Sequence, residues 1–186
     1  MNNQKKDFNK KSKLYFSNKE IALVSTFLVM LLIGGCVWFA GPIIGISLYG
    51  IIWGIILITA AIIIGKKYTI LSLGIVYTLI DFTSASMYGG TLSALNTIAG
   101  VLVLEFFLIL SEDYGLNLKL DLLGLVLLAL VSRTVYVIII TWVYGMALPF
   151  YFALVYYILP HLITFPIGGF IGYKMGKRIK NTVGIL

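Results

Sequence analysis

The stretch GPIIGISLYGIIWGIIL, residues 41–57, holds no charged side chain and continues as an apolar run to Ile64. A helix needs about 20 apolar residues to cross the hydrocarbon core of a bilayer, and this run is long enough. The rest of the chain has the same character: 60% of the 186 residues are hydrophobic and only 11% are charged, whereas soluble domains carry about 25% charged residues. The sequence therefore predicts an all-α integral membrane protein.

Apolar runs separated by charge, glycine or proline divide the chain into six predicted crossings. We expect a basic cytoplasmic tail over residues 1–20, one six-helix membrane domain over residues 21–180, and a short C-terminal tail over residues 181–186. The first run is too long for the core of a signal peptide and lacks a small-residue cleavage pattern. The crossings are predicted at residues 21–40, 42–64, 68–87, 91–110, 122–144 and 150–173.

The basic residues predict the orientation, because cytoplasmic flanks of membrane helices retain Lys and Arg. With the N-terminus inside, thirteen of the 14 basic residues fall in the tails or in the two cytoplasmic loops, and none falls in an external loop. We therefore expect a multi-pass protein of a prokaryotic-type plasma membrane, with both termini cytoplasmic. The net charge of +7 then indicates contact with anionic lipid and no nucleic acid.

The loop SEDYGLNLKLD, residues 111–121, is acidic although it is predicted to be cytoplasmic. Glu112, Asp113 and Asp121 stand there against Lys119. Acidic residues have little influence on orientation. The loop is either a solvated turn or a contact surface for a cytoplasmic partner.

Glycines recur at four-residue steps in the second and last predicted crossings. Gly50 and Gly54 form one such pair, and Gly168, Gly172 and Gly176 form a stripe. Lipid gives helices no hydrophobic reason to associate, so they depend on close approach at small residues. These faces either pack internally or receive a partner protein. Two prolines in the last crossing, at positions 160 and 166, are expected to bend or interrupt it.

Four ionisable side chains lie within the predicted crossings: Asp81, Glu105, Arg133 and His161. Such residues are functional candidates, because burying a charge in a bilayer is costly. At about 1.5 Å rise per residue, Asp81 and Arg133 lie at similar depth, and Glu105 lies nearer the inner surface. Arg133, in LVSRTVYVIIITWVYG (residues 130–145), is therefore expected to pair with Asp81 or to present its guanidinium to a ligand. Glu105 has an inner packing role or faces a partner.

Polar and aromatic residues at helical spacing predict a ligand cavity in the outer half of the bundle. Tyr77 lies one turn from Asp81, Tyr136 lies close to Arg133 on the same helix face, and Asn96 is placed toward the outer cavity. Trp38 and Tyr151 either close the cavity or belong to the interfacial aromatic belt. The predicted ligand-binding residues are Tyr77, Asp81, Asn96, Arg133, Tyr136, Trp142, Tyr157 and His161.

Motifs for intramembrane catalysis are missing from the sequence. The chain has one histidine and one cysteine, with no HExxH or GxSxG motif, so neither a metal site nor a nucleophile with its base is predicted. It also has no P-loop, so any use of ATP belongs to another subunit. We expect no cofactor and no enzymatic activity of the chain itself.

Three segments together resemble the substrate-binding S components of energy-coupling factor (ECF) transporters: GPIIGISLYGIIWGIIL (residues 41–57), YGGTLSALNTIAGVLVLEFFL (residues 88–108) and GGFIGYKMGKRI (residues 168–179). The likeness covers about residues 19–180, and within the group it is nearest to those handling thiamine or its hydroxymethylpyrimidine precursor. The resemblance implies a non-enzymatic subunit that captures a vitamin or related micronutrient at the outer face. It also implies docking on a transmembrane coupling subunit that carries two ABC ATPases.

The family docks through small residues spaced by four on the first helix, typically two alanines. The nearest match here is Ala22 with Thr26, so the second alanine is missing. Two other classes of function remain open. One is a small membrane enzyme acting on a lipid or prenyl substrate, with Arg133 binding a phosphate and Asp81 or His161 as acid or base. The other is a packing or assembly protein in which the charged residues hold helices together.

Overall fold

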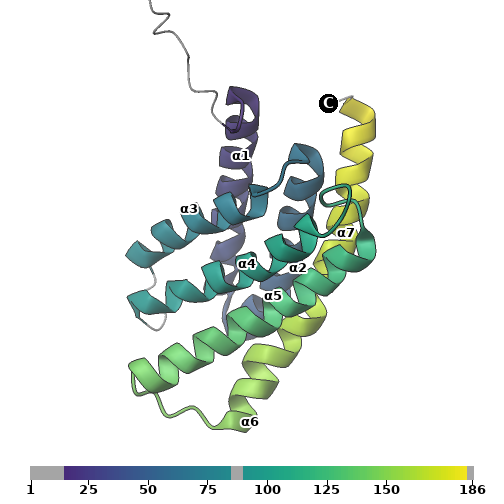
Figure 1. Ribbon diagram of the computed structural model, residues 1–186. Coiled ribbons are helices and arrows are strands. Elements are labelled where there is room, and N and C mark those ends of the chain that lie inside the picture. Colours follow the sequence, from purple (N-terminus) through teal and green to yellow (C-terminus); the bar gives the residue numbers. More distant parts are fainter. Residues whose placement is uncertain (1–14, 85–89, 184–186) are drawn as a thin grey trace, which may run out of the picture.

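The protein is all-helical in the computed structural model, which describes residues 15–84 and 90–183; no strand occurs within these ranges. Two 3-10 turns, Cys36–Ala40 and Thr91–Ala94, and two π-helical segments, Ile139–Val143 and Ala153–Ile158, extend or precede the α-helices. Most of the predicted N-terminal tail and the end of the predicted third crossing lie outside the described residues. The α-helices are α1 (Asn18–Gly35), α2 (Pro42–Ile64), α3 (Thr69–Ser84), α4 (Leu95–Ile109), α5 (Leu118–Ile138), α6 (Phe150–Phe152) and α7 (Leu159–Val183) (Figure 1).

Five helical segments are long and apolar enough to cross a membrane, which agrees with five of the six predicted crossings. The sixth, Thr69–Thr83, is apolar but shorter than the others. The chain is therefore an all-helical protein with several helices suited to a bilayer. The five long segments are Asn18–Ala40, Ile44–Ile64, Thr91–Ile109, Leu118–Val143 and Phe150–Thr182.

The last predicted crossing is one continuous helical segment from Phe150 to Val183, despite its two prolines. Pro166 lies inside α7, and Pro160 is the second residue after the π-helical segment Ala153–Ile158. A π-helical turn is a common companion of a bend, because its wider ring changes the hydrogen-bond register. Of the two expected effects of proline, interruption of the helix does not occur.

The closest helix contact joins α2 to α7 through glycine. A Cβ added at Gly54 would lie 2.7 Å from the Gly169 backbone nitrogen, and one at Gly172 would lie 2.5 Å from the Ile55 carbonyl oxygen. Thr59 Oγ1 donates a hydrogen bond to the Gly172 carbonyl across this contact, at 3.2 Å. Internal packing of the two glycine stripes, one of the two predicted roles, is thereby confirmed, and it fixes the register of α7 on α2.

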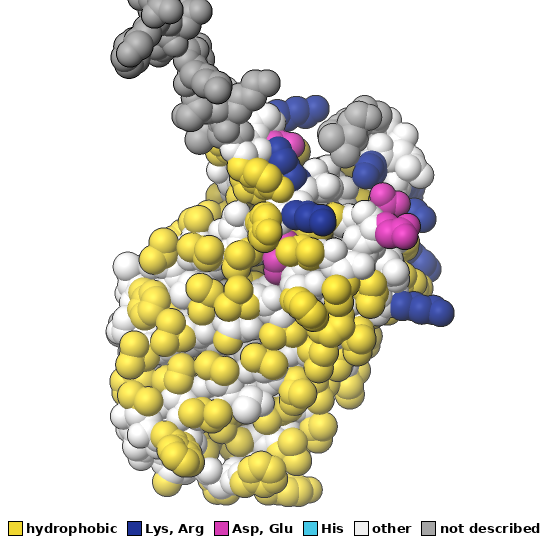
Figure 2. Space-filling view, viewed as in Figure 1, with side chains coloured by type: hydrophobic (Ala, Val, Ile, Leu, Met, Phe, Trp, Pro, Cys, Tyr) yellow, Lys and Arg dark blue, Asp and Glu magenta, His cyan; other side chains and the backbone are white. Residues whose placement is uncertain are grey.

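Charged side chains gather at one end of the bundle, where α1 begins and α7 ends, and the visible face below them is mostly hydrophobic (Figures 1 and 2). Lys66 is held there by Glu20, with Nζ 3.0 Å from Oε2, and its ammonium lies 4.7 Å from the centre of the Tyr15 ring. We call this the charged end of the bundle.

Glu105 caps the start of α3 from the neighbouring helix α4. It is 3% exposed and accepts hydrogen bonds from the Tyr68 N–H (2.6 Å), the Leu71 N–H (3.0 Å) and the Tyr114 hydroxyl (2.8 Å). A carboxylate at a helix N-terminus satisfies free N–H groups and complements the helix dipole. Tyr68 has φ +66°, an uncommon backbone conformation for a side chain of this size. Of the two predicted roles for Glu105, inner packing is confirmed.

The acidic loop is shorter than predicted, because α5 begins at Leu118 and not near residue 122. The Asn117 side chain caps the helix by accepting a hydrogen bond from the Leu120 N–H at 3.3 Å. Asp121 therefore lies in the first turn of α5 and is fully buried, whereas Glu112 and Asp113 are exposed. Burial together with the Glu105 carboxylate raises the pKa of the loop residue Tyr114 above its ordinary value, so this hydroxyl remains a donor.

Candidate functional site

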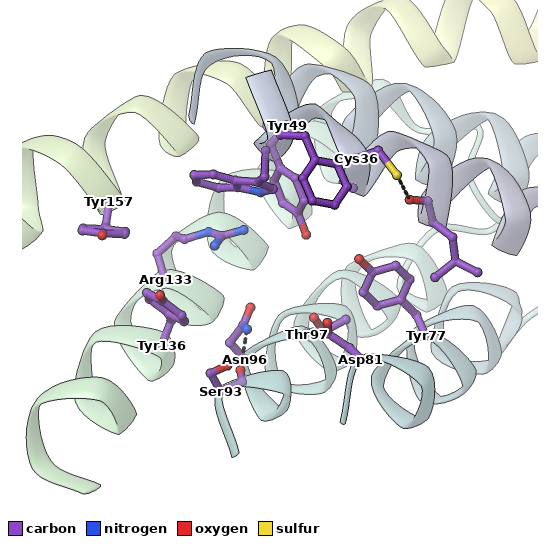
Figure 3. A pocket seen from close by; sticks show the side chains of 14 residues that line it. Cys36, Tyr49, Tyr77, Asp81, Ser93, Asn96, Thr97, Arg133, Tyr136 and Tyr157 are labelled. Carbon is purple, nitrogen blue, oxygen red and sulfur yellow. Dashed lines mark hydrogen bonds between the residues drawn. The ribbon is translucent and has the colours of Figure 1, made fainter. Parts of the chain in front are cut away.

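A cavity of about 360 Å³ lies between the helices, toward the end of the bundle that is opposite the charged end. Its walls come from the end of α1 and the 3-10 turn after it, the start of α2, the end of α3, the start of α4, the later part of α5 and the π-helical segment before α7. The lining residues are Leu32, Gly35, Cys36, Trp38, Phe39, Tyr49, Tyr77, Asp81, Ser93, Asn96, Thr97, Arg133, Tyr136 and Tyr157 (Figure 3).

Six of the eight predicted ligand-binding residues line this one cavity, although they come from four separate stretches of sequence. Periodicity places residues on a common face of each helix, and packing turns these faces toward one another. The six are Tyr77, Asp81, Asn96, Arg133, Tyr136 and Tyr157 (Figure 3).

Arg133 packs against an aromatic ring. Its guanidinium carbon lies 5.0 Å from the centre of the Tyr49 ring, the residue is only 7% exposed, and its Nε has no hydrogen-bond partner among the described residues. Arg133 approaches the cavity from α5 and Asp81 from α3 (Figure 3), and their direct pairing stays a prediction. The two opposite charges, which the sequence placed at similar depth, therefore line one cavity.

Tyr49 is the main residue that the sequence-based set missed. Its ring stacks on Trp53 at 5.1 Å between centroids, and Trp53 meets the edge of Tyr77 at 4.7 Å. The Trp38 ring joins the same wall, with its centroid 5.9 Å from that of Tyr49. Of its two predicted roles, Trp38 therefore has the one of closing the cavity. The spacing of Gly45, Tyr49 and Trp53 at four-residue steps along α2 was the signal that could have found it.

A second aromatic pair and an amide complete the lining. Tyr136 on α5 and Tyr157 on the π-helical segment lie 5.7 Å apart, centroid to centroid. Asn96 donates a hydrogen bond from Nδ2 to the Ser93 carbonyl at 2.5 Å, and its amide oxygen points into the space beside Arg133 (Figure 3). The cavity therefore offers aromatic faces, a hydrogen-bond acceptor, a cation and a carboxylate.

Two predicted ligand-binding residues do not reach the cavity. Trp142 is 87% exposed on the π-helical segment Ile139–Val143 that ends α5, where the wider turns change the direction of the side chains. His161 is fully buried and packs beside Tyr49 and Phe165, at 6.1 Å and 6.0 Å between ring centroids. Tyr151 is 76% exposed, as expected for a residue of the interfacial aromatic belt.

Tyr144 links the segment after α5 to the start of α4, at the end of the bundle where the cavity lies. Its hydroxyl accepts a hydrogen bond from the Leu92 N–H at 3.0 Å. Its ring occupies the space next to Gly90, where φ is +92° and a Cβ would collide with the ring. The contact therefore fixes the 3-10 turn Thr91–Ala94, which carries Ser93 into the cavity wall.

The cavity joins one guanidinium and one carboxylate to aromatic and polar side chains. The histidine proposed as an acid or base lies outside it, and within residues 15–84 and 90–183 no three His, Cys, Asp or Glu side chains converge to hold a metal ion. Asp81 is the one carboxylate among the lining residues.

The two predicted docking residues lie outside the core. Ala22 and Thr26 are both exposed on α1. Thr26 Oγ1 donates to the Ala22 carbonyl at 2.9 Å, so the hydroxyl is satisfied within the helix. This part of α1 therefore presents a narrow surface of small side chains.

Comparisons of the chain with models of known protein families, with curated proteins and with solved structures found no match.

Proposed function

We propose that this protein is the substrate-binding membrane subunit, or S component, of an ECF-type ABC importer. It captures a vitamin or related micronutrient, with thiamine or its precursor as the first candidate, at the outer face of a prokaryotic-type plasma membrane. Six crossings place both termini in the cytoplasm. A transmembrane coupling subunit and two ABC ATPases supply the energy for uptake, and the chain has no enzymatic activity of its own.

The observation that carries this proposal is one cavity lined by residues from six helical stretches, at the end of the bundle away from the charged end (Figure 2). Its volume of about 360 Å³ lies within the range of small-molecule sites, about 300–1,000 Å³. If the charged end is cytoplasmic, as the distribution of Lys and Arg predicts, the cavity faces the exterior. An importer subunit needs its binding site there.

The composition of the lining also supports capture of a ring-containing molecule. Aromatic side chains hold flat rings through their faces and edges, and Trp38, Tyr49, Tyr77, Tyr136 and Tyr157 all line the cavity. An assembly protein would have no need for such a cavity, because packing alone favours filling it with side chains.

The decisive experiment is identification of the small molecules that the protein retains. We expect mass spectrometry of the denatured, detergent-purified protein to release one micronutrient, which rebinds to the emptied protein at micromolar concentration or tighter without chemical change. Arg133→Met and Asp81→Asn should weaken rebinding, whereas the exposed Tyr151→Leu should not. Chemical conversion of the ligand would indicate an enzyme, and absence of binding to a panel of vitamins would refute the proposal.

A further inference from the structure

A second and much smaller cavity adjoins the first, and we call it the inner cavity. It shares Tyr49 and Arg133 with the larger cavity, and Trp53 and Ser132 belong to its lining alone. Its volume is about 10 Å³, which is close to the minimum that one water molecule needs, about 10–15 Å³. The inner cavity is therefore too small for a second water or for part of a micronutrient.

Two buried N–H donors on the wall of the inner cavity need an acceptor. Trp53 is 3% exposed and Arg133 is 7% exposed, and neither Trp53 Nε1 nor Arg133 Nε has a hydrogen-bond partner among the described residues. Both nitrogens can only donate. The Tyr49 ring brings the two side chains together, because it stacks on Trp53 at 5.1 Å and lies 5.0 Å from the guanidinium carbon. Buried donors are nearly always satisfied by protein or by ordered water.

A water molecule has the chemistry that this lining requires. It accepts two hydrogen bonds, one for each donor, and it donates two of its own. Ser132 Oγ donates to the Ala129 carbonyl at 3.3 Å, and its lone pairs can still accept a bond from water. Thr97 adds a second hydroxyl to the lining. Internal waters make about three hydrogen bonds in polar cavities, whereas purely apolar cavities stay dry.

From these observations we infer that the inner cavity binds one water molecule, which accepts hydrogen bonds from the Trp53 indole N–H and from the Arg133 Nε–H. Because the volume admits a single water, both donors share it. The water links α5 to α2, since Arg133 lies on α5 and Trp53 on α2. Trp53 is thereby a positioning residue for the guanidinium. This inference does not depend on the proposed function or on which micronutrient is bound.

The test is water-selective NMR on the detergent-purified wild-type protein, with the nitrogen isotope label confined to tryptophan and arginine. The chain has three tryptophans and two arginines, so the indole and Nε signals can be assigned by substitution. A long-lived internal water gives NOE and ROE cross-peaks of opposite sign, whereas chemical exchange gives cross-peaks of equal sign. We expect the first pattern at the Trp53 indole N–H and at the Arg133 Nε–H. The exposed Trp142 and Arg178 are internal controls and should not show it.

One substitution then shows whether the two N–H groups share a single water. Arg133→Met keeps much of the side-chain length but removes the donor, so the water cross-peak of the Trp53 indole should be lost. Arg178→Met, at an exposed position, should leave that cross-peak unchanged. A Trp53 cross-peak that survives Arg133→Met, as one relayed through a hydroxyl would, overturns the inference. Absence of the water signal at either N–H group in the wild-type protein also overturns it. If circular dichroism shows that Arg133→Met does not fold, the two wild-type signals decide alone.

Discussion

The Arg133 guanidinium lies 5.0 Å from the centre of the Tyr49 ring, and this contact explains how an arginine is held inside a largely apolar helix. Tyr49 is itself supported by Trp53 and Trp38, so the guanidinium rests on a rigid aromatic wall. This wall places the cation at the side of the cavity.

Two substitutions of Tyr49 should show whether its ring or its hydroxyl holds Arg133 in place. Tyr49→Phe keeps the ring and should retain stability, whereas Tyr49→Leu removes the cation–π contact and should lower the free energy of unfolding by about 2 kcal/mol or more. Thermal unfolding of both variants in the same detergent measures the difference. Equal melting temperatures would show that Arg133 is held by other contacts.

The cap that Glu105 provides should be a major source of stability at the charged end. Glu105→Gln keeps the size of the side chain but weakens three hydrogen bonds, and bonds to a charged group contribute about 1.5–3 kcal/mol each. We expect a loss of roughly 2 kcal/mol or more in the free energy of unfolding. The exposed Glu112 is the matched control, and Glu112→Gln should leave the free energy of unfolding unchanged. A similar effect of the two substitutions would refute the capping role.

Close contact between α2 and α7 should make Gly54 intolerant of even one methyl group. The added Cβ of Gly54→Ala meets backbone atoms and not a movable side chain, so the helices must separate, at a cost of about 1–3 kcal/mol. Ala22→Val, which adds bulk at an exposed position of α1, serves as the control for thermal unfolding. A Gly54→Ala variant as stable as the control would mean that the helices approach less closely.

The Tyr144 hydroxyl should slow the release of ligand. Tyr144→Phe keeps the ring beside Gly90 but removes the hydrogen bond from the Leu92 N–H. Loss of one such bond, at about 1 kcal/mol, should raise the dissociation rate of the bound micronutrient about fivefold in stopped-flow measurements. Tyr151→Phe, at an exposed site, should leave the rate unchanged. An unaltered rate in Tyr144→Phe would separate this contact from the binding site.

The exposed part of α1 around Ala22 and Thr26 should be required for assembly with the proposed coupling subunit. Phenylalanine at either position would prevent close approach of a partner helix, so capture of the coupling subunit in a detergent pull-down should fall severalfold. The control is Ile163→Phe on α7, where the native residue is 62% exposed. Undiminished capture by Ala22→Phe and Thr26→Phe would remove these residues from the docking surface.

The sequence by itself determined the helical, membrane-type fold, because long uncharged runs leave few alternatives and helical periodicity places each polar residue on a face. It also determined which helix faces carry small residues, as at Gly54 and Gly172, and which carry polar residues, as at Asp81 and Asn96. These predictions depend only on neighbours within one helix, so they survive without knowledge of the other helices.

Only the tertiary structure decided which faces meet. The rotation and tilt of each helix depend on packing against the others, so periodicity and depth alone wrongly placed His161 and Trp142 in the cavity. The same packing brought Tyr49 beneath the guanidinium and Glu105 onto the first turn of α3. Contacts between residues far apart in sequence are set by how close neighbouring helices can approach, and no single helix carries that information.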